Sequence, residues 1–404
     1  MTSGRPAAAR GTFVSYVLAL YAACRVVTTT ILWAVMQRQV PSGMTGGDDV
    51  PVTYWAFTAL WDGQWYQRIA EGGYPDVLPV TESGKVGENP WAFYPLFPFA
   101  ARAVMTVTGL DFPVVGGALA LLFGFGAAVL MGLLLRDRIG DPAAYAVVVL
   151  WASFPASVSL QLAYTESLAM LLLVGYLYAL SRERWLVATA VALLVGLSRP
   201  IAVPLGLVTL VVVIMRWRRR AERPVLRGEY VSMAAALVGC GVAGLLWPAI
   251  AWWRTGVPTA YTDTMAAWRA YDTVEPFTPW LDKATWFLGD GWGPFWLVVT
   301  PLLIVVLVTG PWARALGADL RAWSLGYPAY LAAVLDPFTS IFRYLIPMFP
   351  LLVVMIGAGW GDRRGNGVVR VLVRTAPWLV VFVVGQYIWT DELWRFVPPS
   401  DYPP

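Results

Sequence analysis

Long apolar segments constrain this chain more than any other feature of its sequence. The first runs from Gly11 to Met36, and about 20 consecutive apolar residues are enough to cross a bilayer as a helix. Further segments of this kind lie at 112–135, 142–163, 165–181, 185–199, 200–215, 229–253, 292–312, 323–338, 341–360 and 375–391. Together they predict an all-α polytopic membrane protein with about 11 transmembrane helices, folded as a single integral membrane domain over residues 1–404.

The composition agrees with a membrane protein and argues against several other classes. Hydrophobic residues make up 58% of the chain and charged residues 13%, whereas an average soluble domain is about half apolar and a quarter charged. A water-soluble enzyme, a disordered chain and a protein with a nucleic-acid partner are therefore poor fits.

The residue types that are missing or rare limit the chemistry. The chain has no histidine, which excludes a Ser-His-Asp triad, imidazole metal ligands and a histidine general base. Cys24 and Cys240 both lie in apolar runs, so neither a zinc–cysteine cluster nor a disulfide framework is expected. Proton transfer must therefore use carboxylates, tyrosines, lysines or water.

Arginine placement predicts the orientation in the membrane, because cytoplasmic loops carry an excess of basic residues. The short basic segment Met1–Arg10 precedes an apolar run too long for a signal peptide, so we expect an uncleaved first span with a cytoplasmic N-terminus. If the spans then alternate, most of the 29 basic residues fall on the cytoplasmic side. They are Arg5, Arg10, Arg136, Arg138, Arg182, Arg184, Arg314, Arg321, Arg363, Arg364, Arg370, Arg374 and the arginines of 216–227.

The run 216–227 is interpreted as a topology determinant that contacts anionic headgroups of the membrane lipids. Lysine occurs only at Lys85 and Lys283. This arginine bias is typical of a GC-rich bacterial genome, and we therefore expect a bacterial plasma membrane.

Residues 90–108 are apolar but do not fit the alternation. Counting them as a span would reverse every later loop, and they contain three prolines and Arg102. We predict an interfacial or re-entrant segment on the outer face, where covering protein can satisfy its backbone. Two extracytoplasmic loops then remain, at 37–90 and 254–291.

The first outer loop contains a carboxylate among aromatic residues. Trp61 and Asp62 are followed one helical turn later by Trp65 and Tyr66. Aromatic rings pack on the apolar faces of pyranoses, and a carboxylate can accept a proton from a hydroxyl group. The alternative is an interfacial aromatic belt with a solvated or helix-capping aspartate.

The apolar hairpin 165–199 places two charges at similar depth. Glu166 lies 17 residues before Glu183 in the turn, and Arg199 lies 16 residues after it. Arms of this length span roughly 23–26 Å at 1.5 Å per residue, less than the ~30 Å core. We therefore expect both charges in a recess below the outer surface, where buried charges mark a functional site. The alternative is a structural Glu166–Arg199 ion pair that holds the hairpin together.

Further arginines occur near the same predicted depth. Arg343 and Tyr344 lie in the outer turn before Pro347. Arg199 and Arg343 together suit a lipid phosphate, because guanidinium groups bind phosphate oxygens in a bidentate manner. The alternative is an arginine that extends to the headgroups. Arg25 lies deeper, within the first span, and is expected to pair with a carboxylate or to line the cavity.

A set of short motifs occurs in a fixed order over residues 61–350. They are Trp61-Asp62, Gly73-Tyr74, Phe93-Tyr94-Pro95-Leu96-Phe97-Pro98, Phe154-Pro155, Tyr164-Thr165-Glu166-Ser167, Arg182–Trp185, Ser198-Arg199-Pro200, and Arg343-Tyr344 before Pro347 and Pro350. The ordered set resembles the PIG-V family, which includes the second mannosyltransferase of GPI-anchor assembly and bacterial relatives within the GT-C glycosyltransferases. Two positions depart from it: Gln64-Trp65-Tyr66 stands where relatives often carry a histidine, and Ile201-Ala202 where they often carry a glycine.

The resemblance implies a GT-C fold and an inverting transfer of mannose from a polyprenyl-phosphate donor to a hydroxyl of a lipid-linked, glycan or protein acceptor. Asp62 would be the general base, and Glu166 would orient substrate hydroxyls or Arg199. Arg199 and Arg343 would bind the leaving phosphate, and sugar packing would fall to Tyr164, Tyr94 and Trp65, with Tyr66 and Tyr344 beside them. No metal is expected to be required, although a divalent cation could bind between Asp62 and Glu166.

Three rival functions remain open at this stage. The same fold could transfer another polyprenyl-phosphate sugar, such as arabinofuranose or glucose. A lipid-linked sugar transporter is a second rival, but transporters often show internal repeats and charges at the midplane. The third is a noncatalytic partner subunit.

Overall fold

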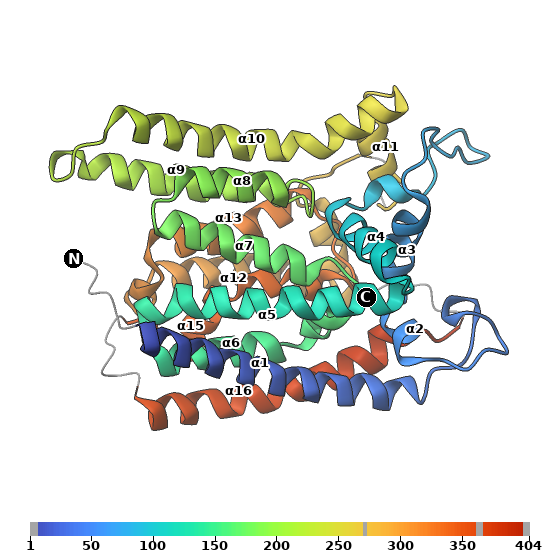
Figure 1. Ribbon diagram of the computed structural model, residues 1–404, viewed down its shortest axis with the longest axis horizontal. Helices are drawn as coiled ribbons and strands as arrows, with labels where there is room; N and C mark the ends of the chain where they lie inside the picture. The colour runs from blue at the N-terminus through green and yellow to red at the C-terminus, as the bar shows by residue number, and fades with distance from the viewer. Residues whose placement is uncertain (1–6, 270–272, 361–366, 399–404) are drawn as a thin grey trace.

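The computed structural model describes residues 7–269, 273–360 and 367–398. In those ranges the regular structure is helical, apart from two isolated β-bridges, Ser42 to Gly47 and Val80 to Val86. The long helices run side by side along one axis and form a bundle (Figure 1). The predicted helical architecture is therefore confirmed.

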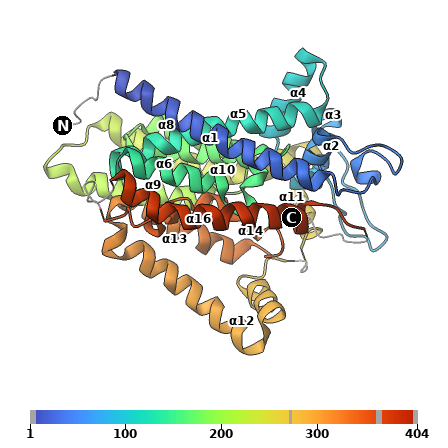
Figure 2. The ribbon, with the colours of Figure 1, turned by 90° about the horizontal axis from the view of Figure 1, so that it is seen from below.

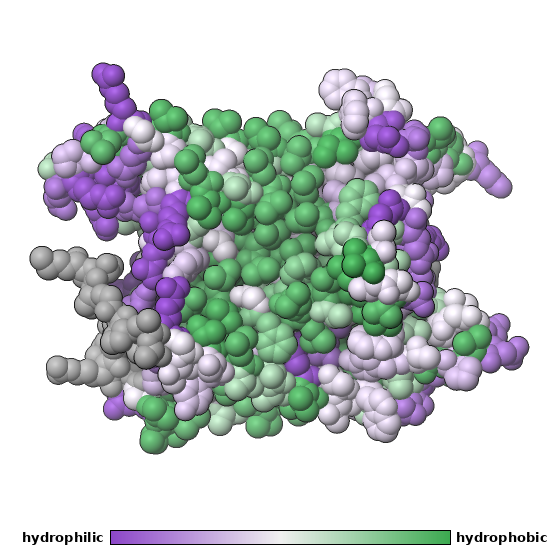
Figure 3. Space-filling model, viewed as in Figure 1, coloured by the Kyte–Doolittle hydropathy of each residue, from purple (hydrophilic) through white to green (hydrophobic). Residues whose placement is uncertain are grey.

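Five helices are long and apolar enough to cross a bilayer, counted over the described residues. They are α1 (Ala7–Met36), α5 (Phe112–Ile139), α10 (Arg227–Thr255), α12 (Thr278–Thr309) and α16 (Val368–Trp389). A sixth span is formed if α6 (Asp141–Ser153) and η3 (Pro155–Gln161), which meet at an angle of 84°, are counted together. Apolar side chains form a broad band across the middle of the molecule, with hydrophilic residues at both ends (Figure 3). The chain is thus a helical membrane protein.

The other predicted spans are shorter helices. They are α7 (Glu166–Ser181), α8 (Trp185–Val195), α9 (Ala202–Arg218) and α13 (Gly317–Val334). At 1.5 Å per residue, the 16 residues of α7 and the 11 of α8 reach only about 24 and 17 Å. Their neighbours are longer: α7 packs on α5, and α8 packs on α10. The count of eleven spans stays a prediction.

A second predicted span, besides the bent 142–163, is not a continuous helix. Residues 341–360 are divided into α14 (Ile341–Tyr344), η6 (Ile346–Met348) and α15 (Pro350–Met355). Pro347 and Pro350 each lack a backbone N–H, and a proline inside a helix removes a hydrogen bond and can kink or break the helix. Both prolines stand at the first or second position of the short helix that contains them. The break allows Arg343 to point into the molecule.

The sharp bend between α6 and η3 explains Arg25. A bend frees backbone carbonyls, which in a membrane must find donors within the protein. Arg25 donates through Nη1 to the Ser157 carbonyl at 2.8 Å and through Nη2 to the Ala152 carbonyl. Gln386 of α16 donates to the carbonyls of Ala152 and Phe154. The expectation that Arg25 pairs with a carboxylate or lines the cavity is therefore wrong, because its guanidinium ends on backbone carbonyls of the bend.

The two ends of the bundle differ. At one end, here called the capped end, lie η1 (Gly43–Thr45), α2 (Tyr54–Thr58), α3 (Asp62–Gly72), η2 (Pro90–Ala92), α4 (Leu96–Thr108) and α11 (Ala260–Ala266). The opposite end, here called the basic end, carries η4 (Arg219–Ala221), η5 (Pro311–Leu316) and ion pairs such as Arg138–Asp319 at 2.5 Å and Arg216–Glu229 at 2.6 Å. Arg5, Arg363 and Arg364 lie outside the described residues.

The segments predicted to lie outside the membrane are more helical than expected. Residues 90–108 form η2 and the 13-residue α4, which packs on α3 and α5. The predicted outer loop 254–291 contains the end of α10, all of α11 and the start of α12, and its position outside the membrane stays a prediction. Gly289 kinks α12 with φ of +83°. The helix then runs obliquely beside the bundle (Figure 2) and contacts α13 and α15.

Candidate active site

Two carboxylates stand at the starts of two helices at the capped end. Asp62 is the first residue of α3, and Glu166 is the first residue of α7. A helix N-terminus carries a partial positive charge and unsatisfied N–H groups, which stabilise a carboxylate placed there. Both carboxylates therefore stand where backbone N–H groups point toward them.

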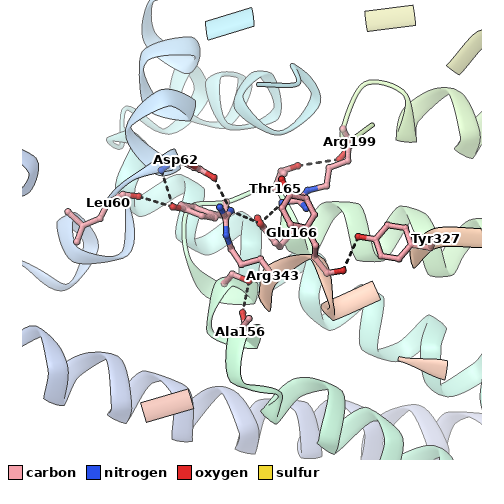
Figure 4. A network of polar contacts seen from close by, with 12 residues as sticks. Leu60, Asp62, Ala156, Thr165, Glu166, Arg199, Tyr327 and Arg343 are labelled. Atoms are coloured by element: carbon pink, nitrogen blue, oxygen red, sulfur yellow. Dashed lines mark hydrogen bonds and ion pairs between the residues drawn. The ribbon is translucent and has the colours of Figure 1, made fainter. Parts of the chain in front are cut away.

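Arg343 of α14 lies between these carboxylates (Figure 4). Its Nη1 donates to Asp62 Oδ2 at 2.8 Å and to Glu166 Oε1 at 2.9 Å. Arg199, which follows α8, donates through Nη2 to the same Glu166 oxygen. Four ionisable side chains from distant parts of the sequence thus form one cluster, here called the tetrad. Their predicted convergence is confirmed.

The tetrad is buried but retains unused hydrogen-bonding groups. The Glu166 side chain is 3% exposed and the Arg343 side chain 7%, while Asp62 is 20% and Arg199 14% exposed. Glu166 Oε2 and Arg343 Nε have no hydrogen-bond partner among the described residues. Buried polar groups are normally paired, so an acceptor and a donor of the tetrad are left unsatisfied in the structure.

Two tyrosines line the guanidinium groups. Arg343 lies over the ring of Tyr164 at 5.1 Å, and Arg199 lies over the ring of Tyr344 at 5.3 Å. Contacts of this kind stabilise a cation over the negative face of a ring. Tyr164 also accepts a hydrogen bond from the Asp62 backbone N–H at 3.0 Å and donates to the Leu60 carbonyl at 3.2 Å. Tyr164 therefore supports both Asp62 and Arg343.

The tyrosine hydroxyls cannot supply the base. Burial raises the pKa of Tyr164 and of Tyr66 well above the ordinary value, and the negative charges of Asp62 and Glu166 raise it further. Both hydroxyls therefore keep their protons at neutral pH. Within the cluster, this leaves the carboxylates as proton acceptors, and Asp62 is the more exposed of the two.

The remaining aromatic candidates lie farther out. Trp65 stacks on Phe93 with ring centroids 5.6 Å apart and meets Trp268 edge-on at 5.3 Å, and the Arg68 guanidinium lies over its ring at 4.6 Å. Its surface is thus engaged by the protein. Tyr94 is buried in a separate aromatic cluster, where its hydroxyl lies 3.0 Å from that of Tyr261. Trp65 lies one helical turn after Asp62 on α3, and Tyr94 lies in the separate aromatic cluster. Their predicted contact with a sugar stays a prediction.

The backbone before Asp62 adopts an unusual conformation. Trp61 has φ of +57° and ψ of −121°, and the Gly63 N–H donates to the Leu60 carbonyl at 3.0 Å. These angles match the first central position of a type II′ turn, roughly +60° and −120°, which usually holds glycine. A non-glycine residue there costs of order 1–3 kcal/mol and persists only where its surroundings hold it.

An apolar pocket adjoins the tetrad on the α7 side. Glu166, Arg199 and Arg343 form its polar part, and Tyr327 of α13 lies beside them. The apolar lining consists of Ala169, Met170 and Leu173 of α7 together with Ile201, Ile346 and Pro347. Residues 166, 169, 170 and 173 share one face of a helix, so the pocket extends from the charges along α7. The lining is therefore charged at one end and apolar along α7.

The tetrad also bears on metal binding. A divalent cation between Asp62 and Glu166 would need the position that Arg343 Nη1 takes. Among the described residues, no group of three or more histidine, cysteine, aspartate or glutamate side chains could hold a metal ion. Whether the chemistry requires a cation stays a prediction.

Sequence reasoning missed one residue near the site. Trp394 is fully buried, and its ring meets that of Tyr164 at 5.3 Å. It is one of 22 tryptophans in the chain, and no motif or spacing distinguishes it from the others.

Comparison with known proteins adds no assignment. No protein-family model matches the chain, and no curated protein matches its sequence. The resemblance to the PIG-V family and the GT-C fold therefore stay predictions, and the argument for function rests on the geometry of the tetrad.

Proposed function

We propose that this protein is an inverting glycosyltransferase of the GT-C type. It would transfer mannose from a polyprenyl-phosphate donor to a hydroxyl of a lipid-linked or glycan acceptor. The capped end would face the outside of a bacterial plasma membrane, and the basic end would face the cytoplasm, as the excess of arginine there favours.

One observation carries this proposal: Arg343 Nη1 bridges Asp62 and Glu166, with Arg199 on the same glutamate. Two guanidinium groups can neutralise a phosphate, and a carboxylate beside them can accept a proton. The apolar pocket along α7 gives further support, because a polyprenyl phosphate has both an anionic group and an apolar chain.

The proposed reaction needs only a proton acceptor and a site for the leaving phosphate, and the tetrad can provide both. The acceptor hydroxyl would lose its proton to Asp62 while its oxygen forms a bond to the anomeric carbon. The bond between that carbon and the phosphate oxygen would break, and polyprenyl phosphate would leave as an anion held by Arg199 and Arg343. A phosphate anion is a stable leaving group, so no general acid is needed. Glu166 would hold both arginines in place.

The test is transfer of labelled mannose by the purified protein. Wild-type protein should move label from polyprenyl-phosphate-mannose to an added acceptor glycolipid, and Asp62→Asn should lower kcat by roughly 10²–10⁴-fold. Asp263→Asn is the matched control, since the Asp263 carboxylate of α11 accepts an exposed hydrogen bond from the Thr259 hydroxyl at 2.6 Å. Transfer by Asp62→Asn at the wild-type rate would refute the assignment of the base.

The donor sugar is tested in the same assay. Polyprenyl-phosphate-arabinofuranose and polyprenyl-phosphate-glucose would be compared with the mannose donor at equal concentration. We expect mannose to give the highest kcat/KM. A higher value for another sugar would keep the chemistry and change the substrate, and movement of intact donor across a vesicle membrane without transfer would favour a transporter.

A further inference from the structure

The turn that presents Asp62 is held by residues from the far end of the chain. The indole Nε1 of Trp61 donates to the Trp394 carbonyl at 2.8 Å, and the Trp394 Nε1 donates to the Phe57 carbonyl at 3.1 Å. These two hydrogen bonds enclose the segment 57–61, which leads directly into Asp62. More than 330 residues separate the partners in sequence.

The conformation of Trp61 makes this contact informative. Glycine is favoured at the first central position of a type II′ turn, yet the position carries the largest side chain. A glycine could adopt the turn but could not reach the Trp394 carbonyl. The tryptophan therefore gives this position an anchor at the expense of backbone strain, and strain of this kind clusters at functional sites.

The Trp394 carbonyl is available because of how α16 ends. The helix passes into a π-helical turn, η8 (Thr390–Trp394), closed by a hydrogen bond from the Arg395 N–H to the Thr390 carbonyl at 3.0 Å. A π-turn is rare and often occurs at functional sites. The turn directs the Trp394 ring against Tyr164, the residue that binds the Asp62 N–H.

The segment that carries Trp394 is itself tied to the end of α1. Gln39 exchanges two hydrogen bonds with Phe396, at 2.9 and 3.0 Å. Arg38 pairs with Asp391 at 2.7 Å. The 390–396 segment is thus fixed from one side by residues that follow α1 and contacts the Asp62 turn on the other.

We infer that Trp394 is a positioning residue for the proposed base, acting through Trp61 and Tyr164. Residues Thr390–Phe396, which carry Trp394 and are here called the C-terminal clamp, direct the Asp62 carboxylate toward Arg343. The inference rests on the proposed function, because it gives the clamp a role in transfer. It predicts that loosening the clamp lowers kcat and leaves donor binding to Arg199 and Arg343 unchanged.

Conservative substitutions test this role. Trp61→Phe and Trp394→Phe each remove one indole N–H while keeping a ring, and Trp394→Leu also removes the ring contact with Tyr164. We expect kcat to fall roughly 10-fold in the first two and up to about 100-fold in the third, since small displacements of a reacting group have effects of this size. Donor KM should stay within about twofold of wild type.

Trp312→Phe is the matched control. Trp312 lies in η5 at the basic end, and its Nε1 donates to the Leu307 carbonyl at 3.0 Å, so the substitution removes the same kind of hydrogen bond far from Asp62. Its melting temperature should fall as much as that of Trp394→Phe, with kcat within about twofold of wild type. Equal kcat in wild type and all three clamp variants would overturn the inference, and so would a rise in donor KM with unchanged kcat.

Hydrogen exchange separates failure of the clamp from failure of the proposed function. The N–H groups of Asp62, Gly63 and Gln64 are bonded to Tyr164, Leu60 and Trp61, respectively. Their exchange should become faster in Trp394→Leu and stay unchanged in Trp312→Phe, whether or not the protein transfers sugar. Faster exchange without any wild-type transfer would refute the proposed function alone. Unchanged exchange in Trp394→Leu would refute the clamp.

Discussion

The two ion pairs of Arg343 should differ in strength because their surroundings differ. Arg343 Nη1 lies 2.8 Å from Asp62 and 2.9 Å from Glu166, so the distances give no reason for a difference. The Glu166 side chain is 3% exposed, whereas that of Asp62 is 20% exposed. Solvent near Asp62 weakens the attraction more than it does near Glu166.

Double-mutant cycles measure each pair separately. One cycle combines Arg343→Met with Glu166→Gln, and the other combines Arg343→Met with Asp62→Asn. Close buried pairs give coupling energies from about 1.5 kcal/mol upward, and exposed pairs give about 0.2–1 kcal/mol. We expect about 2 kcal/mol for Glu166–Arg343 and about 1 kcal/mol for Asp62–Arg343. Arg199 is present in every protein of both cycles, so its direct contribution cancels.

The assay is reversible unfolding in mixed micelles, with the free energy of unfolding taken for wild type, each single variant and each double variant. Arg182–Asp137 at the basic end is the control pair, since its distance is 2.6 Å but its side chains are 38% and 50% exposed. Its coupling should be below about 0.5 kcal/mol. Coupling energies within about 0.5 kcal/mol of zero for both pairs of Arg343 would refute the tetrad as a connected cluster.

Four further predictions concern packing, the helix bend, the tyrosine and the metal. Gly196→Ala should lower the free energy of unfolding by about 1–3 kcal/mol, because the added Cβ would meet the Ala243 carbonyl oxygen at 2.4 Å. The control Gly241→Ala on α10 meets nothing within 4 Å and should be neutral or stabilising. Equal effects of the two substitutions on stability would contradict this packing. Arg25→Leu should lower the free energy of unfolding by about 1–3 kcal/mol, because it removes the donor to the Ser157 carbonyl. The kcat of the folded protein should stay within about twofold of wild type. A large loss of kcat at unchanged stability would instead place Arg25 in the site. Tyr164→Phe should lower kcat without changing how the rate depends on pH between about 7 and 9. Burial holds the pKa of Tyr164 well above its ordinary value, so the hydroxyl stays protonated over that pH range. A shifted pH–rate profile would assign Tyr164 to proton transfer. Transfer should continue in excess chelator, because Arg343 lies where a cation between the carboxylates would bind; loss of activity restored by a divalent cation would contradict this.

The depth of two site residues could be predicted from their positions along a helical hairpin. Similar spacing of Glu166 and Arg199 from the hairpin turn, 17 and 16 residues, predicted that they lie at one depth. Their ion pair agrees, with Glu166 at the start of α7 and Arg199 four residues beyond the end of α8. Asp62 and Arg343 could be assigned to the same end only through orientation and family resemblance. Their contact depends on where α3 and α14 pack, which no local pattern in the sequence specifies.

The failures have identifiable physical causes. Hydropathy concealed the breaks in 341–360, because the prolines there are flanked by apolar residues. Arg25 looked like a site residue because a charge within a span is costly, but its two terminal nitrogens donate to backbone carbonyls at a bend about 130 residues away in sequence. Trp394 could not be predicted, since its role depends on a π-turn and on a strained turn far away in sequence.

The central claim is that the tetrad binds the phosphate of a lipid-linked substrate, and a structure determined with bound polyprenyl phosphate tests it most directly. We predict phosphate oxygens within hydrogen-bond distance of both Arg199 and Arg343, with the chain entering the pocket beside Ala169 and Leu173. Phosphate bound instead at the basic end, near Arg216 and Arg223, with every contact of the tetrad unchanged, would contradict the account.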